Sequence, residues 1–406
     1  MKPPTFFRAA LTLLGAAALA ACADQPLDPR AAPPAGPALT VIPTNALATI
    51  DAGATHSCGL TSAGQGWCWG RNNVGQLGDS TAASTTVPVA VFHPTGVTFT
   101  QVSAGAIHTC AITAAGQAYC WGSNGDGRLG DSTTVLPLMP VAVKPLGAIA
   151  FTSISAGNAH TCGLNGSGQA YCWGNNSYAQ IGDSTKTFAV TPVAVRMPAG
   201  VTFNAIAAAG MHTCALATTG QAYCWGYGGD GAVGNNSLLG SRIPVAVQQP
   251  AGVTFTSIAT EYNHSCGLTS AGQAYCWGYN FYGQLGDSTT VSPRKVPVAV
   301  VQPAGVTFSQ LSTGGSHTCG VTSGGQAYCW GRNTQGQFGD GTLTGALTPT
   351  AVSQPLGVSY GLVTTGSEQT CGLDGVGQAW CSGRNDFSQL GDGSTTRRTS
   401  PVAVSH

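Results

Sequence analysis

The sequence predicts an all-β chain that folds as a seven-bladed β-propeller, with four antiparallel strands and one cross-strand disulfide in each blade. Three observations predict it. A segment of 52 or 53 residues recurs seven times between residue 46 and the C-terminus. Each copy contains two cysteines with nine residues between them. Each copy also divides into four short strand-like runs separated by Gly, Asn and Asp, which is the pattern of a propeller blade.

Residues 1–21 have the pattern of an export signal. Two basic residues precede an apolar run over 9–21, which is too short for a comfortable membrane span. The run ends in Leu-Ala-Ala-Cys22, which resembles the lipobox of bacterial lipoproteins, where the chain is cut before the cysteine and the cysteine receives a lipid. Ala23 then implies the outer membrane rather than retention at the inner membrane. The alternative is an ordinary secretory signal followed by an unrelated cysteine.

The next segment, residues 22–45, is rich in Pro and Ala. We expect it to be a flexible tether between the lipid anchor at Cys22 and one propeller domain over residues 46–406, so that the chain meets the membrane only through its N-terminal lipid. The cysteine count agrees with export. Fifteen cysteines less one lipidated residue leave seven pairs, and disulfides persist in oxidising compartments.

The charge composition argues against nucleic-acid binding. The formal net charge is zero, and 7% of the residues are charged, without a basic run. Phosphate binding requires clustered Lys and Arg that release counterions. We therefore expect no nucleic-acid partner.

The copy over residues 151–195 illustrates how one blade is built. Residues 151–155 alternate apolar and polar side chains and form the first predicted strand. The second and third, 160–164 and 169–173, are joined by a Gly-containing turn, and a short run over 192–195 supplies the fourth.

The spacing of the cysteines suits a hairpin in which Cys162 faces Cys172. The turn is then an odd loop, and Gly168 can take the left-handed position of a bulged three-residue turn. Directly opposed residues of a non-hydrogen-bonded pair have Cα atoms about 4.5 Å apart, which a disulfide can bridge. Structural zinc is the alternative, but it requires four converging ligands, whereas each repeat supplies one opposed pair. We expect no metal or other cofactor, and the predicted disulfides are Cys58–Cys68, Cys110–Cys120, Cys162–Cys172, Cys214–Cys224, Cys266–Cys276, Cys319–Cys329 and Cys371–Cys381.

The two ends of the repeat region suggest how the ring closes. Residues 37–41 look like a degenerate copy of the fourth strand, whose last copy is 401–404. We expect one terminus to complete the blade that the other terminus begins.

The repeat resembles that of a known family. The pattern Gly-x-x-His-Thr-Cys-x-Leu, followed by Gly-Gln-x-Tyr-Cys-Trp-Gly-x-Asn-x-x-Gly-Gln-Leu-Gly-Asp, is similar to the repeat of the regulator of chromosome condensation family over residues 46–406. The resemblance implies a seven-bladed propeller. Founding members of the family are guanine-nucleotide exchange factors for a small nuclear GTPase and dock on chromatin, but an exported, neutral chain meets neither partner, so we do not expect that activity. The cysteine pair in each blade departs from the family pattern, and we interpret it as an adaptation to export.

Two polar slots recur in the repeat. We interpret the histidine as a residue that ties a loop or strand start to backbone groups, because symmetric copies of a side chain around a ring diverge and do not converge on one ion. A metal ring or a proton relay is the alternative. The recurring aspartate is interpreted as a turn-bonding residue. These residues are His56, His108, His160, His212, His264 and His317, with Gln369 in the seventh copy, and Asp79, Asp131, Asp183, Asp287, Asp340 and Asp392, with Asn235 in the fourth.

Catalysis would need groups that break the repeat. Two glutamates do so, Glu261 and Glu368, while Asp126 and Asp230 share a Gly-Asp-Gly slot. The sequence places no nucleophile or metal-ligand set beside them. We therefore predict that the chain is not an enzyme.

The loops of one face depart most from the repeat. The connections between the first and second strands and between the third and fourth strands must share a face, because the chain runs up, down and up again. Tyr and Arg, the residue types that dominate interface hot spots, gather in these loops. The slot after Trp-Gly holds Arg71, Ser123, Asn175, Tyr227, Tyr279, Arg332 and Arg384, and the neighbouring positions add Tyr178, Tyr262, Phe281 and Tyr282.

This distribution predicts a partner-binding face with an aromatic half, over copies three to five, and an arginine half, over copies six, seven and one. The alternative is ordinary loop variation with the aromatic side chains folded back over the blade core. We expect a non-catalytic, exported lipoprotein scaffold that binds an envelope or extracellular protein through this face. A carbohydrate-binding module that stacks sugar rings on the same tyrosines, and an enzyme that acts on envelope polymers, are the alternatives.

Overall fold

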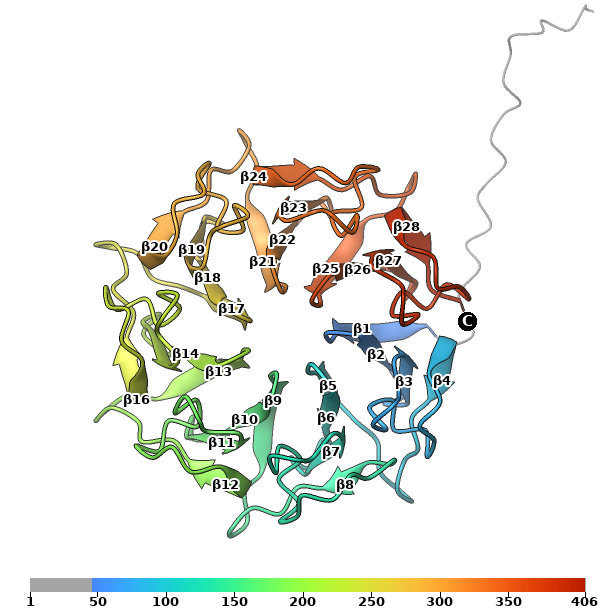
Figure 1. The fold of residues 1–406 in the computed structure, drawn as a ribbon, viewed down its shortest axis with the longest axis vertical. Coiled ribbons are helices and arrows are strands. Elements are labelled where there is room, and N and C mark those ends of the chain that lie inside the picture. The colour runs from blue at the N-terminus through green and yellow to red at the C-terminus, as the bar shows by residue number, and fades with distance from the viewer. Residues whose placement is uncertain (1–45, 406) are drawn as a thin grey trace, which may run out of the picture. The chain divides into compact units, whose positions relative to one another are not determined.

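Seven four-stranded antiparallel sheets stand around a central axis in the computed structural model, which describes residues 46–405 (Figure 1). The predicted export signal, Cys22, the tether and the strand-like run over 37–41 lie outside the described residues. Within the described range no helix is long and apolar enough to cross a membrane. The seven-bladed, all-β class predicted from the repeat is confirmed.

Each blade contains four strands that are consecutive in the chain, with the first strand nearest the axis (Figure 1). The strands of blades one to four are β1 (Leu47–Ala52), β2 (His56–Thr61), β3 (Gly66–Gly70), β4 (Thr85–Ala90), β5 (Gln101–Ala104), β6 (His108–Ile112), β7 (Ala118–Gly122), β8 (Val141–Ala142), β9 (Phe151–Ala156), β10 (His160–Asn165), β11 (Ala170–Gly174), β12 (Ala189–Ala194), β13 (Phe203–Ala208), β14 (His212–Ala217), β15 (Ala222–Gly226) and β16 (Ser241–Ala246). Those of blades five to seven are β17 (Ser257–Glu261), β18 (His264–Leu268), β19 (Ala274–Gly278), β20 (Arg294–Ala299), β21 (Phe308–Thr313), β22 (His317–Thr322), β23 (Ala327–Gly331), β24 (Ala346–Ala351), β25 (Tyr360–Thr365), β26 (Gln369–Asp374), β27 (Ala379–Gly383) and β28 (Arg398–Ala403).

The predicted hairpin register is confirmed. Cys162 of β10 lies directly opposite Cys172 of β11. Gly168 has a φ of 77°, and its N–H donates to the Asn165 carbonyl at 3.0 Å, which closes the three-residue turn. All seven predicted disulfides are present, each with Cα atoms 4.1 Å apart. The zinc alternative for these cysteines is therefore excluded.

The predicted closure of the ring by a shared blade is wrong. Blade one consists of β1 to β4 and blade seven of β25 to β28, so each terminal blade has four strands of its own. The physical reason is the phase of the repeat, which begins at an innermost strand and ends at an outermost one. Seven repeats therefore give seven whole blades. The ring closes by packing instead, with the Leu47 N–H donating to the Gly377 carbonyl at 2.9 Å and Leu47 buried beside Leu373.

The hydrophobic cores lie between neighbouring blades. The core between blades three and four combines the Cys162–Cys172 disulfide with Phe203 and Trp225 of blade four. Trp173, next to Cys172, faces the opposite way, into the core shared with blade two. Neighbouring strand residues point to opposite sheet faces, and both faces of a blade are buried, which is why this third strand reads as a nearly continuous apolar run.

Blade seven departs from this packing. Ser382 takes the position that a fully buried tryptophan holds in the other six blades. Phe338 stands in the slot where other repeats have Leu, Ile or Val, and it is buried in the core between blades six and seven. A larger side chain on one blade thus accompanies the smaller one on the next, as close packing requires.

Candidate functional site

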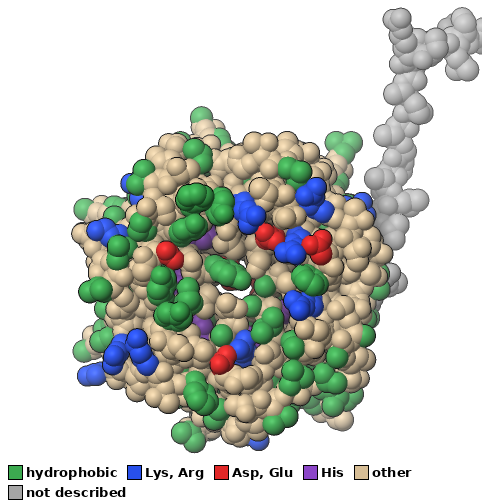
Figure 2. Space-filling model, viewed as in Figure 1, with side chains coloured by type: hydrophobic (Ala, Val, Ile, Leu, Met, Phe, Trp, Pro, Cys, Tyr) green, Lys and Arg blue, Asp and Glu red, His purple; other side chains and the backbone are tan. Residues whose placement is uncertain are grey.

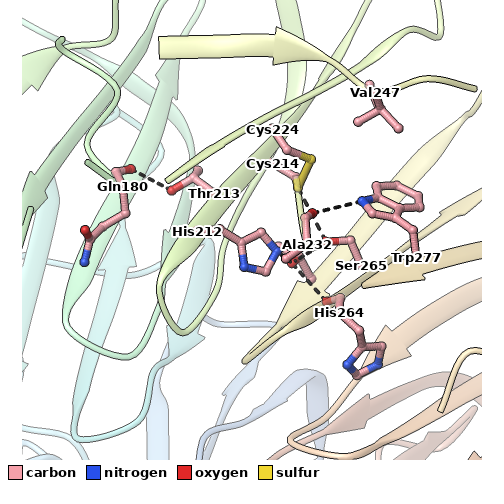
Figure 3. Close-up of a disulfide and its surroundings, with 12 residues drawn as sticks. Gln180, His212, Thr213, Cys214, Cys224, Ala232, Val247, His264, Ser265 and Trp277 are labelled. Atoms are coloured by element: carbon pink, nitrogen blue, oxygen red, sulfur yellow. Dashed lines mark hydrogen bonds between the residues drawn. A yellow bond between two sulfur atoms is a disulfide. The ribbon is translucent and has the colours of Figure 1, made fainter. Parts of the chain in front are cut away.

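A chain of side-chain hydrogen bonds fixes each blade against the next. His56 Nε2 lies 2.8 Å from the hydroxyl of Thr109 in the next blade, and that hydroxyl donates its proton to the Gln76 carbonyl at 2.8 Å. Nε2 of His56 must therefore carry a proton and donate it. Burial lowers the pKa of His56 to about 4, so the ring is neutral at pH 7 and its single proton is on Nε2. Figure 3 shows the equivalent contact between His212 and Ser265, 2.9 Å, beside the Cys214–Cys224 disulfide.

The histidines are thus structural, but their partner differs from the expected backbone group. Each reaches a hydroxyl of the following blade. In blade seven, Gln369 donates to the Gly53 carbonyl of blade one at 2.7 Å and closes the circle. Within residues 46–405, no three His, Cys, Asp or Glu side chains form a group that could hold a metal ion.

One face of the ring carries the connections β1–β2 and β3–β4 and their equivalents, and we call it the loop face. The slot after Trp-Gly has the same backbone anchor in every blade. The Arg71 N–H donates to the Thr55 carbonyl at 3.0 Å, and the Tyr279 N–H donates to the Asn263 carbonyl at 3.0 Å. The backbone of this slot is therefore fixed, while its side chain varies from blade to blade.

In six of the seven blades, an Asn and an Asp hold the rest of the connection between the third and fourth strands. Buried Asn72 donates to the Asp79 carboxylate at 2.9 Å and accepts from the Leu77 N–H at 2.9 Å. Asp79 also accepts from the Thr81 N–H at 3.1 Å, which is the turn bond that the sequence predicted. Blade four lacks this arrangement, because Gly228 and Asn235 replace the Asn and the Asp.

Five of the six residues in the aromatic half of the loop face form two clusters. The six are Tyr178, Tyr227, Tyr262, Tyr279, Phe281 and Tyr282. Tyr178 and Tyr227 meet edge to face across blades three and four, with ring centroids 5.3 Å apart. In blade five, the Phe281 and Tyr282 rings lie 5.2 Å apart, and both also approach Tyr279. Tyr178, Phe281 and Tyr282 are 45%, 62% and 37% exposed, so these three rings are not folded into the blade core.

Tyr262 stands apart from both clusters. It is half-buried in the connection between β17 and β18 and has a positive φ of 41°. Asp230, by contrast, lies near two of the aromatic residues. Burial and then the charge of Asp230 raise the pKa of Tyr227. Burial, then Tyr282 and then Asp230 raise the pKa of Tyr279.

The arginine half, Arg71, Arg332 and Arg384, is brought together by residues that the sequence analysis did not assign to it. Glu368 pairs with Arg332 at 3.2 Å and with Arg384 at 2.9 Å. The guanidinium carbons of Arg71 and Arg384 lie 4.7 Å and 5.5 Å from the centroid of the Phe387 ring. Arg384 also pairs with Asp386 at 2.8 Å. The arginines are thus held in place by a carboxylate and an aromatic ring.

A sequence signal for the missed residues existed. Asp386 and Phe387 follow Arg384 at the same spacing at which Phe281 and Tyr282 follow Tyr279. Comparison of the position three residues after the variable slot, across all repeats, would have added Phe387 to the loop face. Figure 2 shows the result, with hydrophobic side chains to the left of the central opening and a mixed group of basic and acidic side chains to its upper right, over blades six and seven.

The central channel contains a second group of polar residues. Asp51 and Glu261 line a cavity of about 150 Å³ with side chains from the innermost strands of the blades. Burial, and then the charge of Asp51, raises the pKa of Glu261 to about 8, so its carboxyl is protonated at neutral pH. Asp51 accepts from the Ala104 N–H at 2.8 Å. The ring thus brings together two carboxyl groups that are far apart in the sequence, and no His or Cys lines the cavity with them.

Comparison with known protein families identifies the repeat. The profile of the RCC1-like domain matches residues 93–406, and profiles of the regulator of chromosome condensation (RCC1) repeat match residues 63–112 and 48–76. The ultraviolet-B receptor UVR8 of Arabidopsis thaliana is 29% identical over 89% of this chain and 82% of the receptor. The E3 ubiquitin-protein ligase HERC2 of Homo sapiens is 31% identical over 66% of this chain, but this chain covers only 6% of the ligase.

Solved structures share the fold. Human WBSCR16 superposes with a TM-score of 0.76 at 20% identity, over 84% of this chain and 94% of that protein. Yeast RCC1 (Prp20), solved with Kap60 bound, superposes with a TM-score of 0.74 at 18% identity, over 89% of this chain and 86% of that protein. At these identities the likeness concerns the fold alone.

Proposed function

This chain belongs to the RCC1-like domain family of β-propellers, and from that membership we propose that it is a non-catalytic scaffold that binds a protein partner through its loop face. Relatives with recorded partners set the precedent, since yeast RCC1 (Prp20) is solved with Kap60, and its binding to Gsp1p and histones is described. We carry over the ability to bind a protein and not those particular partners.

One observation carries the proposal. The loop face presents exposed aromatic rings, among them Tyr178 and Phe281, beside half-buried arginines on a fixed backbone that extends from blade three to blade one. Rigid aromatic anchors bind at low entropic cost because few rotatable bonds have to be ordered. Truncation of such anchors typically costs 2 kcal/mol or more of binding free energy, which is about a thirtyfold loss of affinity.

The test compares two double variants of the full chain in affinity capture from envelope extract, read by mass spectrometry. Tyr279→Ala with Tyr282→Ala removes two rings from the loop face. Leu146→Ala with Leu356→Ala is the matched control, because both leucines are exposed at turns between blades on the opposite face. We expect a protein retained by the wild type and the control to be lost with the tyrosine variant. Equal capture by all three proteins would refute the proposal, and retention of glycan alone would favour the carbohydrate-binding alternative.

The location is part of the proposal. Seven disulfides suit an oxidising compartment, which supports export of the chain. We propose that residues 1–21 direct this export, that Cys22 carries a lipid at the outer membrane, and that residues 22–45 tether the propeller. Cys22→Ser should move the protein from the membrane fraction to the soluble fraction and abolish incorporation of labelled fatty acid. Labelling that persists in this variant would exclude Cys22 as the anchor.

A further inference from the structure

A pocket of about 300 Å³ opens on the loop face where blades three and four meet, and we call it the blade-four pocket. Four glycines contribute backbone to its wall. Its larger side chains are Tyr178, Tyr227, Leu238, Leu239, Lys186 and Arg242. Leu238 and Leu239 are adjacent apolar residues in the connection between β15 and β16, and they are 47% and 77% exposed.

The pocket exists because blade four breaks the repeat. In the other six blades, an asparagine in the third connection is buried and bonds the recurring aspartate. Gly228 takes this position in blade four, and a Cβ atom there would collide with the Leu239 carbonyl. The chain at Leu239 therefore occupies the space of the missing asparagine, and its loop takes a path that leaves the pocket open.

The same substitutions change the charge. The aspartate of the other blades is Asn235 here, and no carboxylate lines the pocket. Lys186 and Arg242 are exposed at its wall, and among residues 46–405 neither forms an ion pair. In blades five and seven, by contrast, arginines near this point pair with the aspartate. Figure 2 shows basic side chains at the lower left edge of the ring, where blades three and four meet.

We propose that the blade-four pocket binds an acidic peptide segment of the partner protein. A bulky apolar side chain of that segment enters between the two tyrosines and the two leucines, and neighbouring Asp or Glu side chains pair with Lys186 and Arg242. This inference rests on the proposed protein-binding function and adds the chemistry that selects the partner.

The lining favours a peptide over a sugar. Carboxylate and carboxamide side chains hold sugar hydroxyls through paired hydrogen bonds, and no Asn, Gln, Asp or Glu side chain lines this pocket. An apolar wall with a few charged groups at its edge is the composition of a site for an apolar anchor with flanking charges.

The experiment measures binding of fluorescent peptides to the full chain in detergent by anisotropy. The probe is a short Gly/Ser peptide with one Phe between aspartates. Two control peptides replace the aspartates with lysines or the Phe with Ala, and a glucuronate oligosaccharide serves as an acidic sugar. The protein variants are Lys186→Glu with Arg242→Glu, and Tyr227→Ala. Lys295→Glu is the matched control, because it occupies the position of Arg242 one repeat later and lies outside the pocket.

We expect the Asp/Phe peptide to bind, both control peptides to bind more weakly, and the affinity to fall with added salt. The double charge reversal should weaken binding about tenfold or more, and Lys295→Glu should leave it unchanged. Absence of peptide binding, or binding that survives the charge reversal, would overturn the inference, as would binding of the oligosaccharide alone. If the Tyr279/Tyr282 variant loses its captured protein while the charge reversal retains it, the pocket assignment fails and the protein-binding function stands.

Discussion

Arg332 stacks on Tyr282, with its guanidinium carbon 5.4 Å from the centroid of the tyrosine ring. This contact crosses from blade six to blade five and joins the aromatic half of the loop face to the arginine half. Arg332 also pairs with Glu368 of blade seven at 3.2 Å. The two halves predicted from the sequence are therefore parts of one continuous surface.

Glu368→Gln tests the electrostatic support of this surface. The change removes two ion pairs, whose arginine side chains are 33% and 35% exposed. Because partly exposed pairs contribute little, we expect the free energy of unfolding to fall by about 1 kcal/mol at low salt. High salt should remove the difference between variant and wild type, because it screens such pairs. Urea unfolding at two salt concentrations measures both effects. A difference that persists unchanged at high salt would contradict an electrostatic role.

Replacement of one disulfide tests its contribution to stability. Cys162→Ala with Cys172→Ala should lower the free energy of unfolding by about 2–3 kcal/mol, because the bridge between residues ten apart restricts the unfolded chain. Denaturant unfolding under oxidising conditions gives the value. Reduced wild-type protein lacks all seven bridges and should unfold at a much lower denaturant concentration than this variant. An unchanged unfolding midpoint in the variant would show that the bridge contributes nothing.

His160→Gln tests the pH dependence of the inter-blade contact. Burial, followed by the charges of His212 and Arg128, lowers the pKa of His160 to about 3 from its usual 6.5. The stability that depends on its neutral form is fully present above pH 6.5 and is lost as the pH falls towards 3. Gln cannot titrate, and Gln369 already fills this position in blade seven. The variant should therefore lose less stability than the wild type between pH 6.5 and 4, by up to about 1.4 kcal/mol per pH unit.

Thermal unfolding over this pH range measures the effect. His160→Ala is the control that also abolishes titration but removes the group that donates to the Thr213 hydroxyl, so it should be less stable than His160→Gln at pH 7. Parallel stability curves for wild type and His160→Gln would contradict the assignment of the neutral state.

Glu261→Gln tests the central channel. Here stability is lost as the pH rises, whereas for His160 it is lost as the pH falls. Because burial and Asp51 raise the pKa of Glu261 to about 8, the folded protein retains a proton that the unfolded chain loses above its usual pKa of 4.5. The stability associated with the protonated carboxyl is present below pH 4.5 and is lost as the pH rises through 8. Glutamine imitates the protonated form, so the variant should melt at a higher temperature than the wild type at pH 9 and at a similar one at pH 4. A lower melting temperature of the variant at pH 9 would refute this prediction.

The sequence by itself determined the fold of each blade and the positions that vary on the loop face. Hairpin register depends on local spacing, so the number of residues between Cys162 and Cys172, together with the position of Gly168, was sufficient to predict it. The slot that holds Tyr279 and Arg332 was visible because the repeat around it is regular. Export and lipid attachment at Cys22 are also sequence predictions and remain so.

Only the tertiary structure decided which side chains meet. Asp51 and Glu261 share the channel, and Tyr178 meets Tyr227 in the next blade, because the packing of whole sheets sets these contacts. The same packing decided that each terminal blade keeps its own four strands. The hydrogen bonds of a hairpin join residues that are close in the sequence, whereas contacts between blades depend on the angle and spacing of the sheets around the ring, which no local pattern encodes.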